Sequence, residues 1–544
     1  MHEIITLQLG QQSNYLATHF WNAQESYFTY GEDQALSPID HDIHFRPGLA
    51  PDGTETYMPR TVIYDLKSSY GTLRKINALY EIVEEEDSQP QALWQGQATI
   101  HKAPAIPESP YQAALNSGLT PSRPSPSQIR FFSDYSRIFY HPRSIIQLIA
   151  PELELHLNAN IASSSSAASA GPSTSSIPPP LERYAAGEEL FNDLDKEHDL
   201  LDRDLRPFVE EADHMQGVQV IAGMDDAWGG FASQYVERIR DEYGKVGIWV
   251  WGVENGPAWG VSRERRLLRL ANKARSLIEV YKQASIIVPL AVPERLPLRL
   301  QLDYSSQWHT SALLMAAMES ATLPSRLRDP LKRDTLSDMA ELLNTMGKQS
   351  VAGLQMSFSA VESGQRDHRD PLSQRRKLTE EELSEGVQLD VKFTPSDQLE
   401  PYGRRNGYLA LNPRVFSQLI SLRGYSEADN DEQLPMVDER GRIIRQSAYE
   451  PITKTYATPL HFPVLDSYPE IFRNDVGTPV GDVVNITTNL ATDSSVFGRL
   501  KRLRQTVLRS FSIEDRETLG NELMEMADEY HEGWSSGTDD GEDD

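Results

Sequence analysis

Cysteine is absent from this chain of 544 residues, and long hydrophobic runs are absent as well. Without cysteine the chain has no disulfide bond, no thiolate nucleophile and no cysteine-ligated metal site. Its strongest apolar stretches, such as Val246–Val253 and Ala284–Val292, are far shorter than the roughly 20 residues of a transmembrane helix. The opening sequence, MHEIITLQLG, has neither the basic region nor the apolar core of a targeting signal. We therefore expect no transmembrane segment, and we expect any membrane contact to be peripheral.

Basic charge is also scarce, because 52 lysine and arginine residues stand against 80 aspartate and glutamate residues, for a formal net charge of −28. A chain this acidic repels phosphate groups, which disfavours direct binding of nucleic acid. Hydrophobic residues make up 39% of the sequence, enough for a sizeable core, and the length suggests more than one structural unit. We expect a folded protein with polar insertions.

The N-terminal residues show the order strand, glycine turn, helix, strand. Ile4–Leu9 is a β-rich apolar run that Gly10 ends, and Ser13–Phe28 has apolar residues at helical spacing. A second apolar run, Thr61–Leu66, suits a strand that is buried on both faces of a parallel sheet.

A βαβ unit is predicted in the middle of the chain. Val218–Gly223 reads as a buried strand, Asp225–Gly230 as a turn, Phe231–Tyr243 as a helix and Gly247–Val253 as the next strand. Further helices are predicted at Glu188–Ala212, Asn272–Gln283, Thr310–Ala321 and Leu336–Met346.

Several polar segments interrupt these elements. Ser88–Arg130 is rich in Pro, Gln and Ser and is predicted to be a loop. The low-complexity run SSSSAASAGPSTSSIPPP predicts a disordered insertion at about residues 160–185. Glu362–Glu385 is predicted to be a charged linker. From Gly498 onward the chain is predicted to be helical and charged, and its acidic end, Gly537–Asp544, to be unstructured.

Two segments resemble tubulin and occur in the same order as in tubulin. Gly10–Asn14 (GQQSN), followed by Phe-Trp, resembles the Gly-Gln-x-x-Asn loop, and Arg238–Tyr243 (RIRDEY) resembles the end of the helix after the tubulin phosphate loop. More weakly, Tyr57–Leu66 resembles a tubulin strand that ends in Asp-Leu-Glu. Asp338–Leu342 resembles the α-tubulin helix that bears the catalytic acid, although such helical pentads occur by chance and Glu341 is better explained as a charge on a solvated helix face.

Three further segments are typical of one divergent group of tubulin relatives. They are His2–Ile4, Ser133–Ser144 (SDYSRIFYHPRS) and Asp225–Phe231 (DDAWGGF). On these residues the chain is identified as a member of the Misato family, divergent relatives of tubulin and FtsZ. The resemblance implies a tubulin-like fold, association with mitochondria, and a role in organelle partitioning and in inheritance of mitochondrial DNA.

The resemblance also implies where GTP would bind. A phosphate loop works when small residues let several backbone N–H groups converge on phosphate oxygens at a helix N-terminus. Here Asp225, Asp226 and Trp228 stand in that loop. Each like-charge contact at roughly 4 Å costs about 1 to 4 kcal/mol, and the indole adds bulk where the backbone must approach. The residues that would remain of a GTP site are Gly10, Gln11, Gln12, Asn14, Asp65, Gly229 and Gly230.

Other features of this region also disfavour a working nucleotide site. Lys67 stands where tubulins carry a glutamate, and no Gly-Ala-Gly-Asn loop is present. Gly10 and Gln11 are as well explained by a strand–helix turn, and Asp225 and Asp226 by capping of the helix that follows them. We expect no bound cofactor, with GTP as the alternative.

The predicted fold class is α/β and tubulin-like. We expect a doubly wound, mostly parallel N-terminal sheet with the Ser/Pro-rich insertion, then divergent α+β elements and a helical, acidic C-terminus. Residues 1–115 are predicted to form a segment of the Misato segment II type, and 116–360 the tubulin-like core. Residues 361–460 are predicted to hold the charged linker and a divergent second domain, and 461–544 the C-terminal helical region.

The predicted function is that of a non-enzymatic scaffold or assembly factor in mitochondrial inheritance, without catalytic residues. Its partners are expected to be proteins at mitochondria or the cytoskeleton, and its location the outer face of the mitochondrion and the cytoplasm. A GTP-binding switch or polymerising GTPase is one alternative, and an adaptor for cytosolic chaperonin or tubulin folding is another. No metal site is expected, because His41 and His44 lack cysteine partners.

Overall fold

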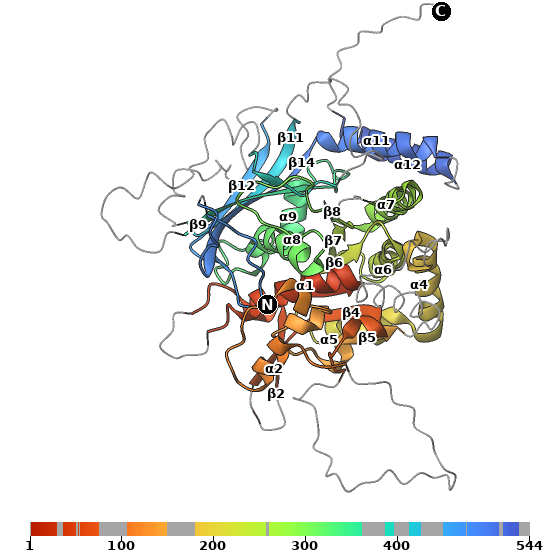
Figure 1. The fold of residues 1–544 in the computed structure, drawn as a ribbon. Helices are drawn as coiled ribbons and strands as arrows, with labels where there is room; N and C mark the ends of the chain where they lie inside the picture. Colours follow the sequence, from red (N-terminus) through yellow and green to blue (C-terminus); the bar gives the residue numbers. More distant parts are fainter. Residues whose placement is uncertain are drawn as a thin grey trace, which may run out of the picture.

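A six-stranded parallel sheet forms the centre of the N-terminal part of the chain (Figure 1). The computed structural model describes residues 2–29, 36–49, 53, 55–75, 106–148, 180–256, 260–361, 387–395, 413–425, 450–474, 476–510 and 515–531. The strand order is β5-β4-β1-β6-β7-β8, with every neighbouring pair parallel. The strands are β1 (Glu3–Leu9), β4 (Thr61–Leu66), β5 (Ile145–Leu148), β6 (Met215–Gly223), β7 (Gly247–Val253) and β8 (Ile286–Leu290). Because the chain builds outward from β1 to one edge and then to the other, the strand order reverses between β1 and β6.

Helices cover both faces of this sheet, which explains why its strands are apolar on both sides. Ile4 and Ile63 lie in a core shared with α1, α8 and α9. Leu7 and Val62 point to the other face, into a core shared with α4, α6 and α7. The helices are α1 (Gln11–Glu25), α4 (Tyr184–His198), α6 (Ala227–Glu242), α7 (Arg263–Gln283), α8 (Gln307–Ala321) and α9 (Leu336–Leu343). The predicted doubly wound, tubulin-like α/β fold is confirmed.

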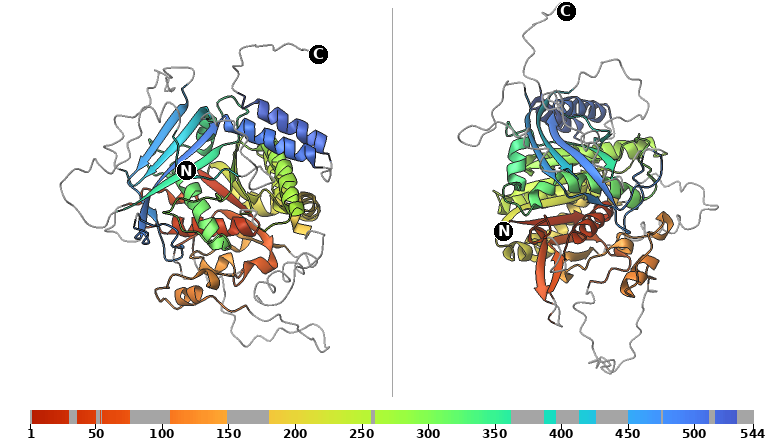
Figure 2. Two further views of the ribbon diagram at one scale, coloured as in Figure 1. Left: turned by 45° about the horizontal axis from the view of Figure 1, so that its top comes forward. Right: turned by 90° about the vertical axis from the view of Figure 1, so that its left-hand side faces the viewer.

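A second, mixed sheet packs over α8 and α9 (Figure 2). Its order is β10-β9-β14-β11-β12; β11 and β12 are parallel and the other pairs are antiparallel. The strands are β9 (Gly353–Ala360), β10 (Val391–Lys392), β11 (Val415–Arg423), β12 (Ile452–Thr458) and β14 (Val483–Asp493), with β13 (Phe462–Pro463) beside β14. Strands from before residue 361 and after residue 460 therefore share one sheet.

Two C-terminal helices, α11 (Ser495–Arg509) and α12 (Arg516–Asp528), pack on each other and on α7 (Figures 1 and 2). They agree with the predicted helical C-terminus. Smaller elements of the described part include β2 (Phe45–Leu49), β3 (Glu55–Pro59), α2 (Pro110–Asn116), a π-helical turn (Leu201–Leu205) and α5 (Arg206–Glu210). Among the described residues, no helix is both long enough and apolar enough to span a membrane.

A buried charge cluster joins the second sheet to the parallel-sheet body. Glu319 on α8 accepts a hydrogen bond from the Arg326 guanidinium at 2.6 Å and forms an ion pair with Arg423 on β11. Arg423 also donates to the Tyr27 hydroxyl at 2.8 Å. All three charged side chains are fully buried. The two arginines lower the pKa of Glu319 against the effect of its burial, so that the carboxylate stays ionised.

The helix predicted over Glu188–Ala212 is divided into α4, the π-helical turn and α5. Three further differences from the predicted elements have a local cause. Helix α6 begins at Ala227 rather than Phe231, because the Asp226 side chain accepts a hydrogen bond from the Trp228 N–H at 2.9 Å and caps the helix. Helix α7 begins nine residues earlier than predicted, at Arg263, where Ser262 is its cap. The third difference is α2, which forms inside the predicted loop Ser88–Arg130 after a Ser-Pro capping sequence.

Other predicted segments lie wholly or mainly outside the described residues. These are most of the predicted insertion at 160–185, the predicted linker Glu362–Glu385 and the acidic end Gly537–Asp544. The last residues of the predicted insertion are described, and they form a 3₁₀ turn (Pro180–Glu182) and the start of α4.

Candidate functional site

The candidate site lies where the strand order reverses, at the carboxyl ends of β1 and β6. Gly10 joins β1 to α1 with φ +86° and ψ 169°, a conformation that is essentially restricted to glycine. Its N–H donates to the Tyr64 carbonyl of β4 at 2.9 Å, and its own carbonyl accepts the Asn14 N–H at 3.1 Å. The first loop predicted from the sequence is therefore formed.

The Trp228 indole lies directly against this loop. A Cβ atom placed on Gly10 would come 2.4 Å from Trp228 Nε1 and 2.5 Å from Cδ1. Only 8% of Trp228 is exposed, and its ring packs edge-on against Phe231, with 5.7 Å between ring centroids. The indole thus fills the space in which a phosphate group would approach the Gly10 backbone. The residues present do not fit a phosphate here.

Two carboxylates next to Trp228 are already engaged within the protein. Asp226 caps α6, and Asp225 accepts hydrogen bonds from Asn255, from its backbone N–H at 3.2 Å and from Nδ2 at 2.8 Å. Asn255 in turn accepts a hydrogen bond from Gln12 Nε2 at 2.6 Å. This chain of contacts ties the start of α1 to the loops after β6 and β7.

Burial raises the pKa of both carboxyl groups. The pKa of Asp226 is raised to about 7, first by burial and then by the neighbouring Asp225 carboxylate. The pKa of Asp225 is raised by burial, against which the Arg269 guanidinium and the hydrogen bonds from Asn255 act. A polyanion would add further negative charge to a pair that already resists ionisation.

Gly229 and Gly230, predicted as remnants of the phosphate loop, lie inside α6 instead. A Cβ atom on Gly229 would come 2.1 Å from Ser276 Oγ on α7, and one on Gly230 would come 2.1 Å from the Tyr184 carbonyl oxygen on α4. Both glycines therefore allow close packing of α6 on its neighbouring helices. The turn predicted over Asp225–Gly230 is wrong, because its last four residues are helical.

Asn14 and Asp65, both assigned from the sequence to the remnant of a GTP site, are in contact. Asn14 Nδ2 donates to Asp65 Oδ2 at 2.7 Å, and the Leu66 N–H donates to Asp65 Oδ1 at 2.8 Å. Burial raises the pKa of Asp65 to about 7 despite these hydrogen bonds. Lys67 is exposed and Gln11 is half-buried in the first turn of α1.

A cavity of about 200 Å³ opens beside Gln12, between α1 and α8. Its polar lining includes Gln12, Asn255, Gln307 and Ser311, and Tyr15 contributes an aromatic wall. Gln12 Oε1 is buried and has no hydrogen-bond partner among the described residues. Sequence reasoning found Gln12 but missed Asn255, Gln307 and Ser311, since ordinary polar residues on separate elements give no local signal.

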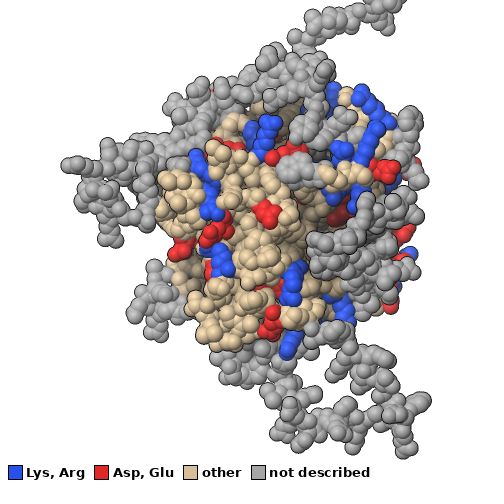
Figure 3. All heavy atoms as spheres, in the orientation of Figure 1, with Lys and Arg blue, Asp and Glu red and all other residues tan. Residues whose placement is uncertain are grey.

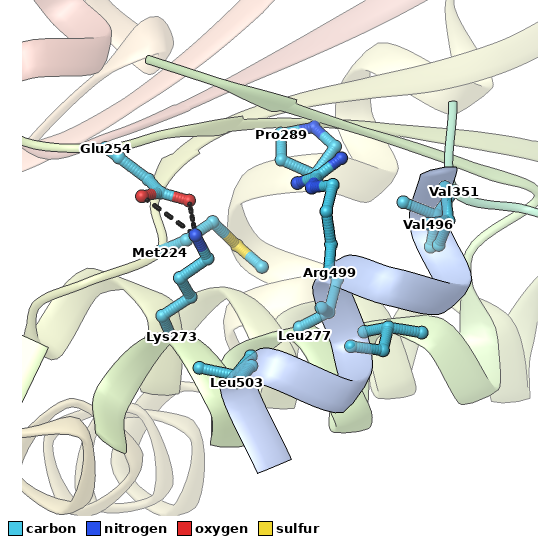
Figure 4. Close-up of a pocket in the computed structure, with 10 residues that line it drawn as sticks. Met224, Glu254, Lys273, Leu277, Pro289, Val351, Val496, Arg499 and Leu503 are labelled. Atoms are coloured by element: carbon cyan, nitrogen blue, oxygen red, sulfur yellow. Dashed lines mark hydrogen bonds and ion pairs between the residues drawn. The ribbon is translucent and has the colours of Figure 1, made fainter. Parts of the chain in front are cut away.

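A second, much smaller cavity of about 20 Å³ lies beneath α11 and is lined by a buried ion pair. Lys273 Nζ lies 2.8 Å from Glu254 Oε1, and Glu254 lines both cavities. Figure 4 shows Glu254, from the loop after β7, meeting Lys273 of α7, with Arg499 and Leu503 approaching from α11. The smaller cavity has room for no more than a water molecule.

The segment that resembles the catalytic helix of α-tubulin lies elsewhere. Helix α9 begins beside Gln216, whose Oε1 accepts a hydrogen bond from the Leu336 N–H at 2.7 Å. Gln216 lies at the amino end of β6, whereas Gly10 lies at the carboxyl ends of the strands. Asp338 forms a capping box with Thr335, and Glu341 is exposed. Among the described residues, no three His, Asp or Glu side chains are grouped closely enough to hold a metal ion.

Sequence comparison with known proteins identifies the family of this chain. A family model described as a Misato Segment II tubulin-like domain matches residues 2–117, and one described as a tubulin domain matches residues 121–327. The chain is 56% identical to Protein dml-1 of Neurospora crassa over 100% of both chains. It belongs to the Misato family of tubulin-like proteins.

Other Misato-family relatives are more distant. Protein DML1 of Gibberella zeae is 42% identical over 100% of both chains. Protein misato homolog 1 of Pongo pygmaeus is 28% identical, over 79% of this chain and 74% of the relative. The family identified from the sequence is confirmed.

One Misato-type segment, Ser133–Ser144, packs against α1 rather than forming a site of its own. The Tyr135 hydroxyl donates to the Tyr15 carbonyl at 2.8 Å, and the Arg137 N–H donates to Asn22 Oδ1 at 2.9 Å. The Arg137 guanidinium also reaches Asp466 at 2.7 Å. The segment therefore holds α1, and with it the first loop, in place.

Proposed function

We propose that this Misato-family protein is a non-enzymatic scaffold or assembly factor that acts in mitochondrial partitioning and in inheritance of mitochondrial DNA. It works at the outer face of the mitochondrion and in the cytoplasm, through contacts with other proteins. Membership of the Misato family supports the process. The packing of Trp228 on Gly10 supports the non-enzymatic character, because it leaves no room for the phosphate chain of a nucleotide.

Hydrolysis of a nucleotide requires a phosphate cradle, a Mg²⁺ site and a positioned water. In this chain the N–H at the start of α6 is capped by Asp226, and the Asp65 carboxylate is held by Asn14 and the Leu66 N–H. The groups that would bind phosphate and Mg²⁺ are thus already hydrogen-bonded within the protein. A tubulin-like body whose nucleotide site is filled in this way provides surfaces for binding proteins and does not provide a site for hydrolysis.

GTP binding is the second candidate, and the cavity beside Gln12 favours it. Its volume of about 200 Å³ and its amide and hydroxyl lining suit a polar planar group. A nucleotide bound there would need Trp228 to move away from Gly10.

Titration with a fluorescent GTP analogue in Mg²⁺ separates the two candidates. For the scaffold we expect no saturable binding up to about 1 mM, which corresponds to an affinity weaker than roughly −4 kcal/mol. Binding at micromolar concentration, competed by GTP but not by ATP and weakened by Gln12→Ala, would overturn the proposal. The variant with Asp225→Gly, Asp226→Gly and Trp228→Ala tests whether opening the loop restores binding.

A cellular experiment tests the process itself. The endogenous fungal gene is replaced by this chain, either unchanged or with Gln12→Ala, and retention of mitochondrial DNA and the distribution of mitochondria are measured. The scaffold proposal expects both chains to support normal inheritance, and loss of the protein to impair it. Normal inheritance in cells without the protein contradicts the proposed process.

A further inference from the structure

Helix α11 is strongly basic in a chain whose net charge is −28. Ser495–Arg509 contains five basic residues and no acidic residue. Its apolar stripe is buried against the body: Val496, Leu500, Leu503 and Val507. Arg502 and Arg509 are exposed and Lys501 is half-buried. Figure 3 shows blue side chains gathered at the upper right, where Figure 1 draws α11 and α12.

Three of these five basic residues have no anionic partner among the residues that the structure describes. Lys501, Arg502 and Arg509 form no ion pair with any residue that the structure describes. The Lys501 ammonium lies over the Phe497 ring, 4.1 Å from its centroid. Glu522 of the adjacent helix α12 pairs with Lys282 at 3.1 Å, and Glu529, the residue after this helix, pairs with Lys348 at 2.8 Å. We call Lys501, Arg502 and Arg509 the α11 basic face.

The end of the chain carries the complementary charge and leaves the body at this place. Residues 532–544, which lie outside the described residues, contain six acidic residues and no basic one. Helices α11 and α12 run antiparallel, so that the His531 ring lies 5.1 Å from the ring of Phe497 in the first turn of α11. The acidic segment therefore begins beside Lys501.

The acidic segment is long enough to cover the whole basic face. Its 13 residues span up to about 45 Å when extended, whereas the 15 residues of α11 rise about 22 Å. Because the segment is tethered at one end of α11, its effective concentration there is of the order of millimolar. Weak multivalent contacts suffice for binding at that concentration.

We propose that residues 532–544 dock on the α11 basic face of the same chain and shield it from other anionic partners. The contact consists of carboxylate–ammonium and carboxylate–guanidinium pairs. It is therefore sensitive to salt, since pairs at a surface are screened over about 10 Å at 0.1 M ionic strength. An acidic partner protein must displace the segment to reach α11.

Zero-length cross-linking of the full-length chain tests the proposal. A carbodiimide joins carboxylates to lysine amines that are in contact, and Lys501 is the lysine of α11. We expect mass spectrometry to find Lys501 joined to residues 539–544, with a yield that does not change on tenfold dilution and falls several-fold in 0.5 M NaCl. A yield that falls with dilution shows contact between copies and overturns docking within one chain, as does the absence of this cross-link.

Charge variants give a second readout. A labelled peptide of residues 532–544 is titrated against the full chain and against a full-length variant with Asp539→Asn, Asp540→Asn, Glu542→Gln, Asp543→Asn and Asp544→Asn. We expect at least fivefold tighter binding to the variant, because its own tail no longer competes. Equal affinity for the two chains overturns the proposal.

Two controls locate the binding surface. Adding Lys501→Glu, Arg502→Glu and Arg509→Glu to the neutral-tail variant is expected to abolish peptide binding. The matched changes Lys67→Glu, Arg143→Glu and Lys245→Glu, also at exposed positions, are expected to preserve it. Vesicles of phosphatidylserine and phosphatidylcholine should bind the neutral-tail variant more than the full chain, and equal binding contradicts shielding by the tail. Circular dichroism melting confirms that each variant is folded.

Discussion

The contact between Gly10 and Trp228 makes a quantitative prediction for a double-mutant cycle. Gly10→Ala forces a side chain into a backbone conformation that costs about 1 to 3 kcal/mol for a residue other than glycine. It also brings Cβ to 2.4 Å from the indole, and overpacking of this kind typically costs a further 1 to 3 kcal/mol or so. We expect a total loss of about 2 to 6 kcal/mol in the free energy of unfolding.

Trp228→Ala removes the indole, which is 8% exposed, and is expected to cost about 3 to 5 kcal/mol. In the double variant the backbone strain at Gly10 persists, but the steric clash disappears. The loss should then be about 1 to 3 kcal/mol smaller than the sum of the two single losses.

Urea denaturation followed by far-ultraviolet circular dichroism measures the three variants at one pH and ionic strength. Pairing Gly10→Ala with Phe358→Ala is the control, because the Phe358 ring packs on Phe472 in the second sheet. That pair should be additive to within about 0.5 kcal/mol. If Gly10→Ala and Trp228→Ala are equally additive, the indole does not fill the loop and does not keep a phosphate group from Gly10.

Three further predictions concern packing, pH and buried charge. Gly230→Ala should destabilise the chain by about 2 to 4 kcal/mol in urea denaturation, although alanine favours helix by about 1 kcal/mol, because its Cβ would lie 2.1 Å from the Tyr184 carbonyl oxygen. The pKa of Asp226 is raised to about 7, so its contribution to stability is full below about pH 4 and is lost as the pH rises through 7. Asp226→Asn, which retains a capping side chain, should therefore be more stable than the native chain at pH 8. We expect its free energy of unfolding in urea to exceed the native value by about 1 to 2 kcal/mol at pH 8, with little difference at pH 4. Arg423→Met should cost about 3 to 5 kcal/mol in urea denaturation because it leaves Glu319 undercompensated, and adding Glu319→Gln should recover part of the loss.

Each of these predictions has an opposing outcome. A stabilising Gly230→Ala would mean that α4 does not lie close against α6. The same difference between Asp226→Asn and the native chain at pH 4 and pH 8 would show that burial does not raise the pKa of this carboxyl. A loss below 1 kcal/mol for Arg423→Met would place Glu319 in contact with water.

The sequence was sufficient to predict the elements whose sequence patterns are local. The apolar run Ile4–Leu9 before Gly10 predicted β1 and the loop after it, and Gly247–Val253 predicted β7, whose seven residues are all buried. A strand buried on both faces is continuously apolar, so its pattern is independent of the rest of the fold. The family was recognisable for a similar reason, since Asp225–Phe231 and Ser133–Ser144 are contiguous motifs.

The start of α6 shows where local reasoning was misled. Two adjacent glycines lower helix propensity, which placed Gly229 and Gly230 in a turn. In the folded chain their missing side chains admit α4 and α7, and the packing outweighs the loss of propensity. The hypothesis that Asp225 and Asp226 cap the helix is correct for Asp226, whereas Asp225 binds Asn255 instead.

The amino-acid sequence by itself determined the class of fold, the order of the N-terminal elements and the family, because these depend on contiguous patterns. Tertiary structure alone decided that Trp228 lies on Gly10 and that Gln12 meets Asn255, a residue 243 positions away. Such contacts depend on the strand order that sets β6 beside β1 and β7 beside β6, and on the crossover that brings the start of α6 to the carboxyl end of β1. No local preference of either residue encodes them, and they are the contacts that turn a tubulin-like loop into a packed part of the core.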